Sequence, residues 1–319
     1  MTNNTIAGTV AGRTAGPAFG SNEFVFEPAT KDKAKARIAL AGPSGSGKTW
    51  TALVTATAFG GPIAVIDTER GSAAKYSGRN GFTFNTLRMH KYDPRDLVKA
   101  LASAANSGHE VVIVDSLSHF WSGTDGMLEQ VDSAGKRGYG GNSFGGWKEA
   151  SPIEKQMIDA LCSYPGHVIV TMRVKTEYII ETNSRGKQEP RKVGLKPEQR
   201  AGIEYEFDVV GDLDLENTLV VSKSRCSELS GTVIRKPDGA FAQRVLDWLN
   251  DGEETDSVTE FNDAALAEGA TLEDLRALYT RVERRGLLGS ALLDPDGNPT
   301  TLGSLIKAIG AQRRAEATS

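Results

Sequence analysis

The amino-acid sequence predicts an α/β fold with a mainly parallel central sheet flanked by helices, followed by a small helical C-terminal unit. Three observations support this prediction. Between about residues 34 and 250, short apolar runs alternate with helical stretches. A glycine-rich loop separates the first of these runs from an alanine-rich stretch at residues 49–59. Beyond residue 257, apolar residues recur at the spacing of amphipathic helices.

The predicted strands are near-continuous apolar runs, several of them rich in valine and isoleucine. They cover residues 37–41, 62–67, 110–115, 167–171 and 218–222. Strands that are buried on both faces of a parallel sheet have this pattern, because helices cover both faces and leave no solvated side. We therefore expect these runs to form the centre of one domain over residues 34–250.

The predicted domain is bounded by segments of different composition. Residues 1–33 are rich in Gly, Ala, Thr and Asn and predict a flexible N-terminal segment, in which Phe24–Phe26 are apolar enough to dock onto the core. Acidic and polar residues at 251–257 predict a linker. Beyond it, Thr271 and Asp274 have the spacing of a capping box. We expect residues 257–319 to form a small helical region that packs on the core or binds a partner.

Charge and composition exclude several classes of protein. The chain of 319 residues has a net charge of −4, so any contact with nucleic acid must come from local basic patches. Its two cysteines lie far apart, and it has neither a signal-like start nor an apolar run of about 18 residues. These features predict a reduced, cytoplasmic setting and no membrane partner.

The strongest motif is Gly-Pro-Ser-Gly-Ser-Gly-Lys-Thr at residues 42–49, a full match to the phosphate-binding loop pattern. In such loops the backbone N–H groups point at the β-phosphate, the lysine reaches the β- and γ-phosphates, and the final hydroxyl binds Mg²⁺. The helix that follows directs its positive end at the anion. The sequence therefore predicts a site for ATP and Mg²⁺. It would be formed by Gly42, Pro43, Ser44, Gly45, Ser46, Gly47, Lys48 and Thr49.

Two carboxylates that follow predicted strands complete the expected chemistry. Asp115 ends the apolar run 110–115, at the position of a Walker B aspartate that holds Mg²⁺. Its alternative role is to cap the following turn. Glu69 follows the strand 62–67, and we expect it to orient the water that attacks the γ-phosphate. The alternative for Glu69 is a surface ion pair with Arg70.

The order of these motifs resembles that of the RecA-type recombinase ATPases. The shared features are the phosphate loop, a strand ending in Asp67-Thr-Glu69, a run ending in Asp115-Ser116, and a late strand ending in Lys223-Ser-Arg225. Residues 167–175 and 202–208 resemble more closely the small RecA-like ATPases of bacteriophages, which are associated with single-strand annealing and recombination. The resemblance covers about residues 36–236. It implies a RecA-like P-loop NTPase core and, for a phage-encoded chain, a location in the host-cell cytoplasm.

The resemblance also implies roles for three basic residues. In RecA-like rings and filaments the nucleotide lies between subunits, and Lys223 and Arg225 would reach the γ-phosphate bound by a neighbour. Residues two apart on a strand share a face, so both can point across one interface. Arg173 stands where RecA proteins usually have a glutamine that senses the γ-phosphate. The alternatives are a solvated or paired basic face for Lys223 and Arg225, and a structural ion pair for Arg173.

Two further stretches are candidates for contact with single-stranded DNA. Residues 175–200 predict a hairpin with a polar tip, in the place where RecA-like proteins carry a DNA-binding loop. Residues 135–148 combine basic groups and aromatic rings with a glycine-rich, flexible backbone. The alternatives are a solvated surface hairpin and a mobile loop. The candidate DNA-binding residues are Lys136, Arg137, Arg185, Lys187, Arg191 and Lys192.

Together these features predict a RecA-like protein that binds and hydrolyses ATP and acts on single-stranded DNA in phage-type recombination or annealing. It would form a homo-oligomeric ring or filament with ATP sites shared between subunits. Two alternatives stay open: a P-loop kinase or other phosphotransferase, and a nucleotide-gated DNA-annealing scaffold with little turnover. A GTPase is disfavoured, because the chain has no Asn-Lys-x-Asp motif.

Overall fold

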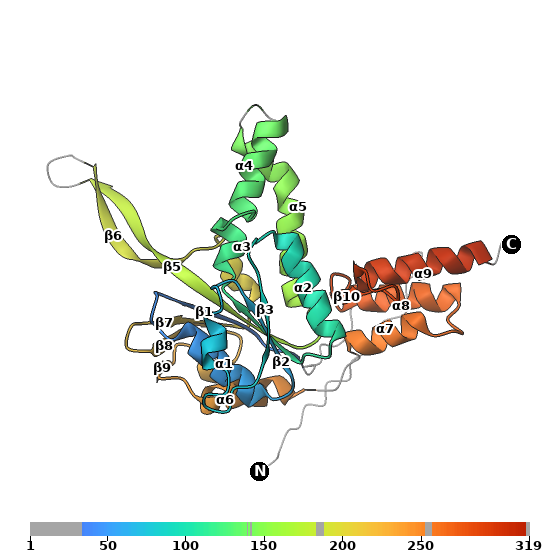
Figure 1. Cartoon of the computed structure of the whole chain (residues 1–319), viewed down its shortest axis with the longest axis horizontal. Helices are drawn as coiled ribbons and strands as arrows, with labels where there is room; N and C mark the ends of the chain where they lie inside the picture. Colours follow the sequence, from blue (N-terminus) through green and yellow to red (C-terminus); the bar gives the residue numbers. More distant parts are fainter. Residues whose placement is uncertain (1–33, 139, 141, 183–187, 253–256, 317–319) are drawn as a thin grey trace, which may run out of the picture.

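One mixed sheet forms the centre of the main domain in the computed structural model, which describes residues 34–138, 140, 142–182, 188–252 and 257–316 (Figure 1). Its strands are β1 (Arg37–Gly42), β2 (Ile63–Asp67), β3 (Asn85–Arg88), β4 (Val111–Asp115), β5 (His167–Thr182), β6 (Gln188–Pro197), β7 (Val209–Leu213), β8 (Thr218–Ser224) and β9 (Val233–Arg235). They are ordered β3-β2-β4-β5-β1-β7-β8-β9, and β6 pairs with β5 outside this path. The strands from β3 to β7 in this order are parallel, whereas β8 and β9 are antiparallel to their neighbours. The predicted α/β class with a mainly parallel sheet is confirmed.

Helices cover both faces of this sheet. They are α1 (Lys48–Phe59), α2 (Pro94–Asn106), α3 (Ser118–Ser122), α4 (Met127–Gly138), α5 (Ser143–Cys162) and α6 (Gly239–Asn250). Side chains of α2 and α5 share one buried cluster with Ala39 and Ala41 of β1, and those of α1 and α6 share another with Ile38 and Leu40. Successive strand residues point to opposite faces, so a strand that is covered on both sides must be apolar throughout.

The start of α2 shows how local sequence sets an element in this fold. Asp93 precedes the helix, and its carboxylate accepts a hydrogen bond of 2.9 Å from the backbone N–H of Arg95. Pro94 occupies the first helical position, where a missing N–H costs nothing because that group would have no partner within the helix. The helix therefore begins at Pro94, after the five residues that follow β3 at the carboxyl edge of the sheet.

Two hairpins extend from the main domain, one formed by β5 and β6 and the other by α4 and α5 (Figure 1). The first confirms the predicted hairpin, although its tip at residues 183–187 lies outside the described residues. The second contradicts the expected flexible loop at residues 135–148, because most of that stretch is helical. Trp147 packs near Trp121, with ring centroids 5.8 Å apart. A Cβ atom at Gly146 would meet the carbonyl oxygen of Val131 at 2.1 Å. This glycine permits close packing of α5 on α4.

We expect Gly146→Ala to destabilise the protein by about 1–3 kcal/mol, because a methyl group there overlaps the backbone of α4. Thermal unfolding measures the change. The matched control is Gly310→Ala in a C-terminal helix, where a Cβ atom meets nothing within 4 Å and the change is expected to stabilise by about 0.5–1 kcal/mol. Equal melting temperatures for the two variants would contradict the close packing of α4 and α5.

The C-terminal unit consists of α7 (Val258–Leu266), α8 (Leu272–Arg284), β10 (Ala291–Leu293), β11 (Pro299–Thr301) and α9 (Leu302–Glu316). The predicted capping box is present: the hydroxyl of Thr271 accepts from the N–H of Asp274 at 3.2 Å, and the Asp274 carboxylate accepts from the N–H of Thr271 at 3.0 Å. The unit has its own buried cluster, while Ala291 of β10 joins the cluster of α2 and α5. The unit thus packs on the main domain.

Two further predictions concern segments that the structure describes only in part or not at all. The predicted flexible segment at 1–33 and the centre of the predicted linker, residues 253–256, lie outside the described residues. Within the described part, no helix is both long and apolar enough to cross a membrane.

Candidate nucleotide site

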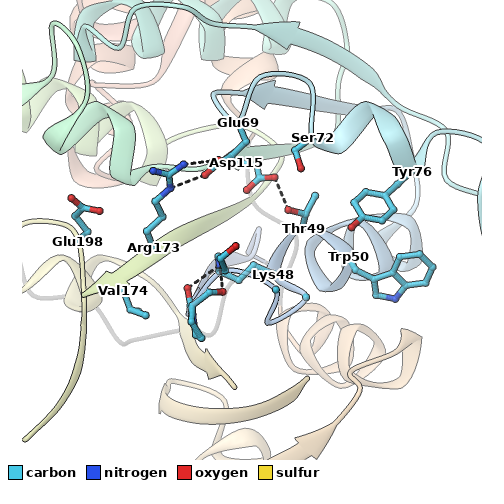
Figure 2. A pocket seen from close by; sticks show the side chains of 15 residues that line it. Lys48, Thr49, Trp50, Glu69, Ser72, Tyr76, Asp115, Arg173, Val174 and Glu198 are labelled. Atoms are coloured by element: carbon cyan, nitrogen blue, oxygen red, sulfur yellow. Dashed lines mark hydrogen bonds and ion pairs between the residues drawn. The ribbon is translucent and has the colours of Figure 1, made fainter. Parts of the chain in front are cut away.

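A pocket of about 470 Å³ lies at the carboxyl edge of the parallel strands (Figure 2). β1 leads into the glycine-rich loop there, and β2, β4 and β5 carry their last sheet residues to the same edge. Loops at this edge of an open α/β sheet form the usual ligand crevice. The lining includes most of the loop at residues 42–49 together with Trp50, Glu69, Ser72, Tyr76, Asp115, Arg173, Val174 and Glu198.

The glycine-rich loop has the backbone shape and the charge to hold an anion. Gly45 and Gly47 both have a φ of 84°, in the left-handed region that side chains disfavour. The Lys48 ammonium donates to the carbonyl oxygens of Gly42 and Pro43, each at 2.8 Å. Burial lowers the pKa of Lys48, although the nearby carboxylate of Asp115 opposes this shift. The loop thus keeps a partly buried cation where phosphate oxygens could replace the two carbonyls.

Asp115 and Thr49 lie together at the floor of the pocket. The Thr49 hydroxyl donates to one carboxylate oxygen of Asp115 at 2.7 Å, and the Thr171 hydroxyl donates to the other at 2.5 Å. Burial raises the pKa of Asp115, and these neutral hydroxyls only partly offset it. A buried carboxylate beside a hydroxyl is a donor set that suits Mg²⁺, so the residues fit the metal. Thr49 and Asp115 would hold it, and it would supply positive charge to the phosphates.

Glu69 and Arg173 form a two-point ion pair across the mouth of the pocket. The Arg173 Nε atom lies 2.9 Å from Oε1 of Glu69, and Nη2 lies 2.6 Å from Oε2 (Figure 2). Burial alone would raise the pKa of Glu69, but the hydrogen bonds and charge of Arg173 outweigh it and lower the pKa overall. Glu69 is therefore ionised and bound to Arg173, not to Arg70. Glu69, which we expect to orient water, is thus bound to Arg173, which we expect to sense the γ-phosphate.

The turn that carries Glu69 is fixed by buried polar groups. The carboxylate of Asp67 accepts from the N–H of Glu69 at 2.7 Å. The hydroxyl of Thr68 lies 2.8 Å from Nδ1 of His119, and that nitrogen is 4.0 Å from Oε1 of Glu69. Burial and the charge of Arg173 lower the pKa of His119. A largely neutral imidazole therefore stands behind the Glu69 carboxylate.

Several pocket residues were not found by sequence reasoning. Trp50 and Tyr76 form an aromatic wall, with ring centroids 5.7 Å apart, and Trp50 is 38% exposed. Such a wall is suited to a flat base next to the phosphates. Behind the lining, His119 lies 4.0 Å from Glu69 and Thr171 donates a hydrogen bond to Asp115. Thr171 gave the clearest signal, as a polar residue at the end of a predicted apolar strand, whereas Tyr76 lies in no recognisable motif.

Lys223 and Arg225 do not line this pocket. β8 runs antiparallel to β7, so its last residues lie at the amino edge of the parallel strands. Asn217, just before β8, lies against Gly47 of the loop. Lys223 lies six residues further along this strand than Asn217, a distance of about 20 Å at ~3.3 Å per residue. Within one subunit these cations are therefore remote from the phosphate loop.

Both cations have partners of their own at that edge. The Lys223 ammonium donates to the carbonyl oxygens of Glu204, Tyr205 and Phe207, at distances of 2.9, 3.0 and 2.6 Å. Arg225 pairs with Asp208 at 2.8 Å, although its side chain remains 55% exposed. Arg225 thus presents an accessible guanidinium on the surface.

The candidate DNA-binding residues are divided between the two hairpins. Lys136 and Arg137 lie at the end of α4, where Lys136 pairs with Asp132 at 2.6 Å and Arg137 with Glu149 at 3.4 Å. Arg191 and Lys192 lie on β6, and Arg185 and Lys187 lie outside the described residues. Among the described side chains, those of Lys136 and Arg137 do not line the nucleotide pocket.

The comparison with known families agrees with this geometry. A family model described as an AAA domain matches residues 34–247, the region that contains the sheet and the whole pocket. A search of curated proteins gives no match. The matched region indicates a nucleotide-binding ATPase domain, in keeping with its phosphate loop. The chain belongs to the AAA domain family, with an α/β P-loop NTPase core.

Proposed function

We propose that the protein is a Mg²⁺-dependent ATPase of RecA-like type that acts on single-stranded DNA in recombination or annealing, and that its subunits share ATP sites. The observation that carries the proposal is the division of charged groups between two edges of one sheet. The phosphate loop, Glu69 and Arg173 lie at the carboxyl edge. Lys223 and Arg225 lie at the amino edge.

The chemistry of the pocket fits hydrolysis of a nucleoside triphosphate. The loop N–H groups and Lys48 would bind the β- and γ-phosphates, and the phosphate charge would draw Lys48 from the carbonyls of Gly42 and Pro43. The aromatic wall of Trp50 and Tyr76 would flank the base. These contacts bind the substrate without yet activating water.

Glu69 would then act on the attacking water. It accepts one proton as the water oxygen bonds to the γ-phosphorus, the bond to the β–γ bridging oxygen breaks, and ADP leaves with that oxygen. This role requires Glu69 to leave Arg173, to which it is bound through both oxygens. The γ-phosphate offers Arg173 a replacement anion. ATP binding would thereby release the carboxylate that hydrolysis requires.

The edge position of Arg225 supports a shared site. A head-to-tail assembly places the amino edge of one subunit against the carboxyl edge of the next, and such contacts produce rings or open filaments. Arg225 is exposed and could exchange Asp208 for the γ-phosphate of a neighbour. An arginine supplied in this way typically raises turnover by roughly 10³–10⁵-fold.

The continuity of β5 supports a link between DNA and the nucleotide. Its residues up to Arg173 pair with β1 in the sheet, and from Val174 onward it pairs with β6 in the extended hairpin. DNA bound along this hairpin would therefore act on the strand that carries Arg173. We propose single-stranded DNA as the polymer on this ground and on the family resemblance of the hairpin.

The test is ATP hydrolysis by wild type and Arg225→Ala over a range of protein concentrations, with and without single-stranded DNA. We expect wild-type turnover per subunit to rise cooperatively with concentration and with DNA. In Arg225→Ala we expect turnover to fall by about 10³-fold or more, because the cation in trans is lost. The matched control is Arg313→Ala, which removes another ion-paired arginine, half-buried in the C-terminal unit and paired with Glu316 at 3.3 Å.

Turnover that is independent of concentration, of DNA and of Arg225 would contradict the shared site and favour a monomeric phosphotransferase. DNA annealing that continues without measurable hydrolysis would favour a nucleotide-gated scaffold. Equal losses in the Arg225 and Arg313 variants would indicate a general effect of removing surface arginines.

A further inference from the structure

A second pocket lies beside the nucleotide site and has no role in the chemistry above. It has a volume of about 430 Å³ and is lined by Arg70, Arg88, His90, Tyr92 and Thr124. Arg70 directly follows Glu69, Arg88 ends β3, and Thr124 lies between α3 and α4. We call this feature the basic pocket.

The basic pocket contains cations without anions. No carboxylate lines it, and within the described part of the chain the side chains of Arg70, Arg88 and His90 make no ion pair or hydrogen bond. The acids next to the lining residues in sequence are already paired: Glu69 with Arg173 at 2.6 Å, Asp125 with Lys91 at 3.1 Å and Asp93 with Arg95 at 2.5 Å. Arg70 and Arg88 line the same pocket, and two guanidinium groups in one pocket favour an anion. The planar fork of each group matches phosphate oxygens.

The two arginines converge on the same turn of the backbone. Arg88 lies over the turn after Glu69, because a Cβ atom at Gly71 would meet the Arg88 guanidinium carbon at 3.2 Å. Arg70 has a φ of 57°, in the left-handed region that is uncommon for residues other than glycine. Residues held in such conformations cluster at functional sites, because the surrounding structure has to maintain them.

We propose that the basic pocket binds a phosphodiester group of single-stranded DNA. This inference rests on the proposed function and adds a contact site outside the two hairpins. β3 is the end strand of the sheet and all four of its residues are exposed, so a polymer can run past the pocket. The pocket lies at the carboxyl edge, from which the β5–β6 hairpin also extends. The strands β3 and β5 are three spacings apart, or about 14 Å, a distance that a site of several nucleotides spans.

Two short structural connections link the basic pocket to Glu69, through which DNA bound in the pocket would affect the ATPase site. One is the peptide bond between Glu69 and Arg70. The other runs from Tyr92, whose ring centroid is 4.8 Å from that of His119, to the His119 nitrogen 4.0 Å from Glu69. Arg70 and Tyr92 are positioning residues in this scheme. A phosphate bound to Arg70 would also restrain the turn that carries Glu69, the residue that must separate from Arg173 before hydrolysis.

The test is binding of a fluorescent oligothymidylate to the full chain, measured by anisotropy over a series of salt concentrations, for wild type and for Arg70→Gln/Arg88→Gln. Each phosphate contact to a single strand contributes a slope of about −0.7 to log K against log salt, so we expect the double variant, which loses one phosphate contact, to flatten the slope by about 0.7. At ~0.1 M salt the same relation predicts an affinity loss of about 5-fold. Arg79→Gln is the matched control, because Arg79 is exposed, has no side-chain partner among the described residues and lies outside the pocket.

Competition with inorganic phosphate distinguishes a site for a phosphodiester group of DNA from a site for free phosphate. If the double variant keeps the DNA affinity and salt slope of the wild type, the inference is overturned. The proposed function still stands in that case, because the wild-type chain binds DNA. Failure of the wild-type chain to bind DNA overturns both. A site meant for free phosphate would show displacement of DNA by millimolar inorganic phosphate beyond the effect of sulfate at equal ionic strength, and that result also overturns the inference. Thermal melting confirms that the variants are folded.

Discussion

Replacement of Lys48 by alanine is expected to abolish measurable ATP binding while the fold remains intact. The Lys48 ammonium is the cation within the phosphate loop, and it is partly buried, so water screens its charge less than that of a surface lysine. Removing one partner of a hydrogen-bonded, desolvated charge pair costs about 2–5 kcal/mol, which weakens ATP affinity by at least about 30-fold. Hydrolysis is expected to be lost with binding.

Isothermal titration calorimetry with ATP and Mg²⁺ measures this effect, and thermal unfolding confirms the fold. Lys99→Ala is the matched control, because Lys99 forms only a surface pair with Asp96 at 2.8 Å, and such pairs contribute about 0–1 kcal/mol. ATP affinity of wild-type strength in Lys48→Ala would show that the loop does not bind the phosphates. An equal loss in the Lys99 variant would mean that the effect is unspecific.

The positions of the phosphate loop and of Asp115 at the ends of β1 and β4 could be predicted because both depend on contiguous sequence. The loop is eight successive residues, and Asp115 ends a strand that its own apolar run identifies. The fold class followed in the same way, since helices that cover both faces make each strand apolar throughout. Contiguous sequence was therefore sufficient to predict the positions of the loop and Asp115 and the fold class.

The contacts between remote segments could not be predicted in this way. Glu69 and Arg173 meet because β4 alone separates β2 from β5 in the sheet, and strand order is not visible in the composition of single strands. The edge on which Lys223 lies depends on the direction of β8, which an apolar run does not reveal. The glycines of residues 135–148 indicated a flexible loop, although Gly146 instead permits close packing of two helices. Glycine content alone does not distinguish flexibility from close approach.

The second large effect is expected for Glu69→Gln, which should bind ATP with nearly unchanged affinity but hydrolyse it about 10²–10⁴-fold more slowly. Glutamine keeps the size of the side chain and one hydrogen-bond acceptor for Arg173. It cannot accept the proton of the attacking water. Single-turnover hydrolysis, with ATP affinity measured in parallel, separates the lost chemical step from any loss of binding.

The ion pair adds an expectation for ATP affinity, because Glu69→Gln also removes the negative charge that pairs with Arg173. A freed Arg173 can turn to the γ-phosphate without competition, so ATP affinity should be equal to or slightly above that of wild type. Glu198→Gln is the matched control: Glu198 lines the same pocket, but its carboxylate accepts from the Ser122 hydroxyl at 2.9 Å and lies on the opposite side of Arg173 (Figure 2). We expect this variant to retain most of its turnover. Normal hydrolysis in Glu69→Gln, or an equal loss in Glu198→Gln, would assign the catalytic carboxylate elsewhere.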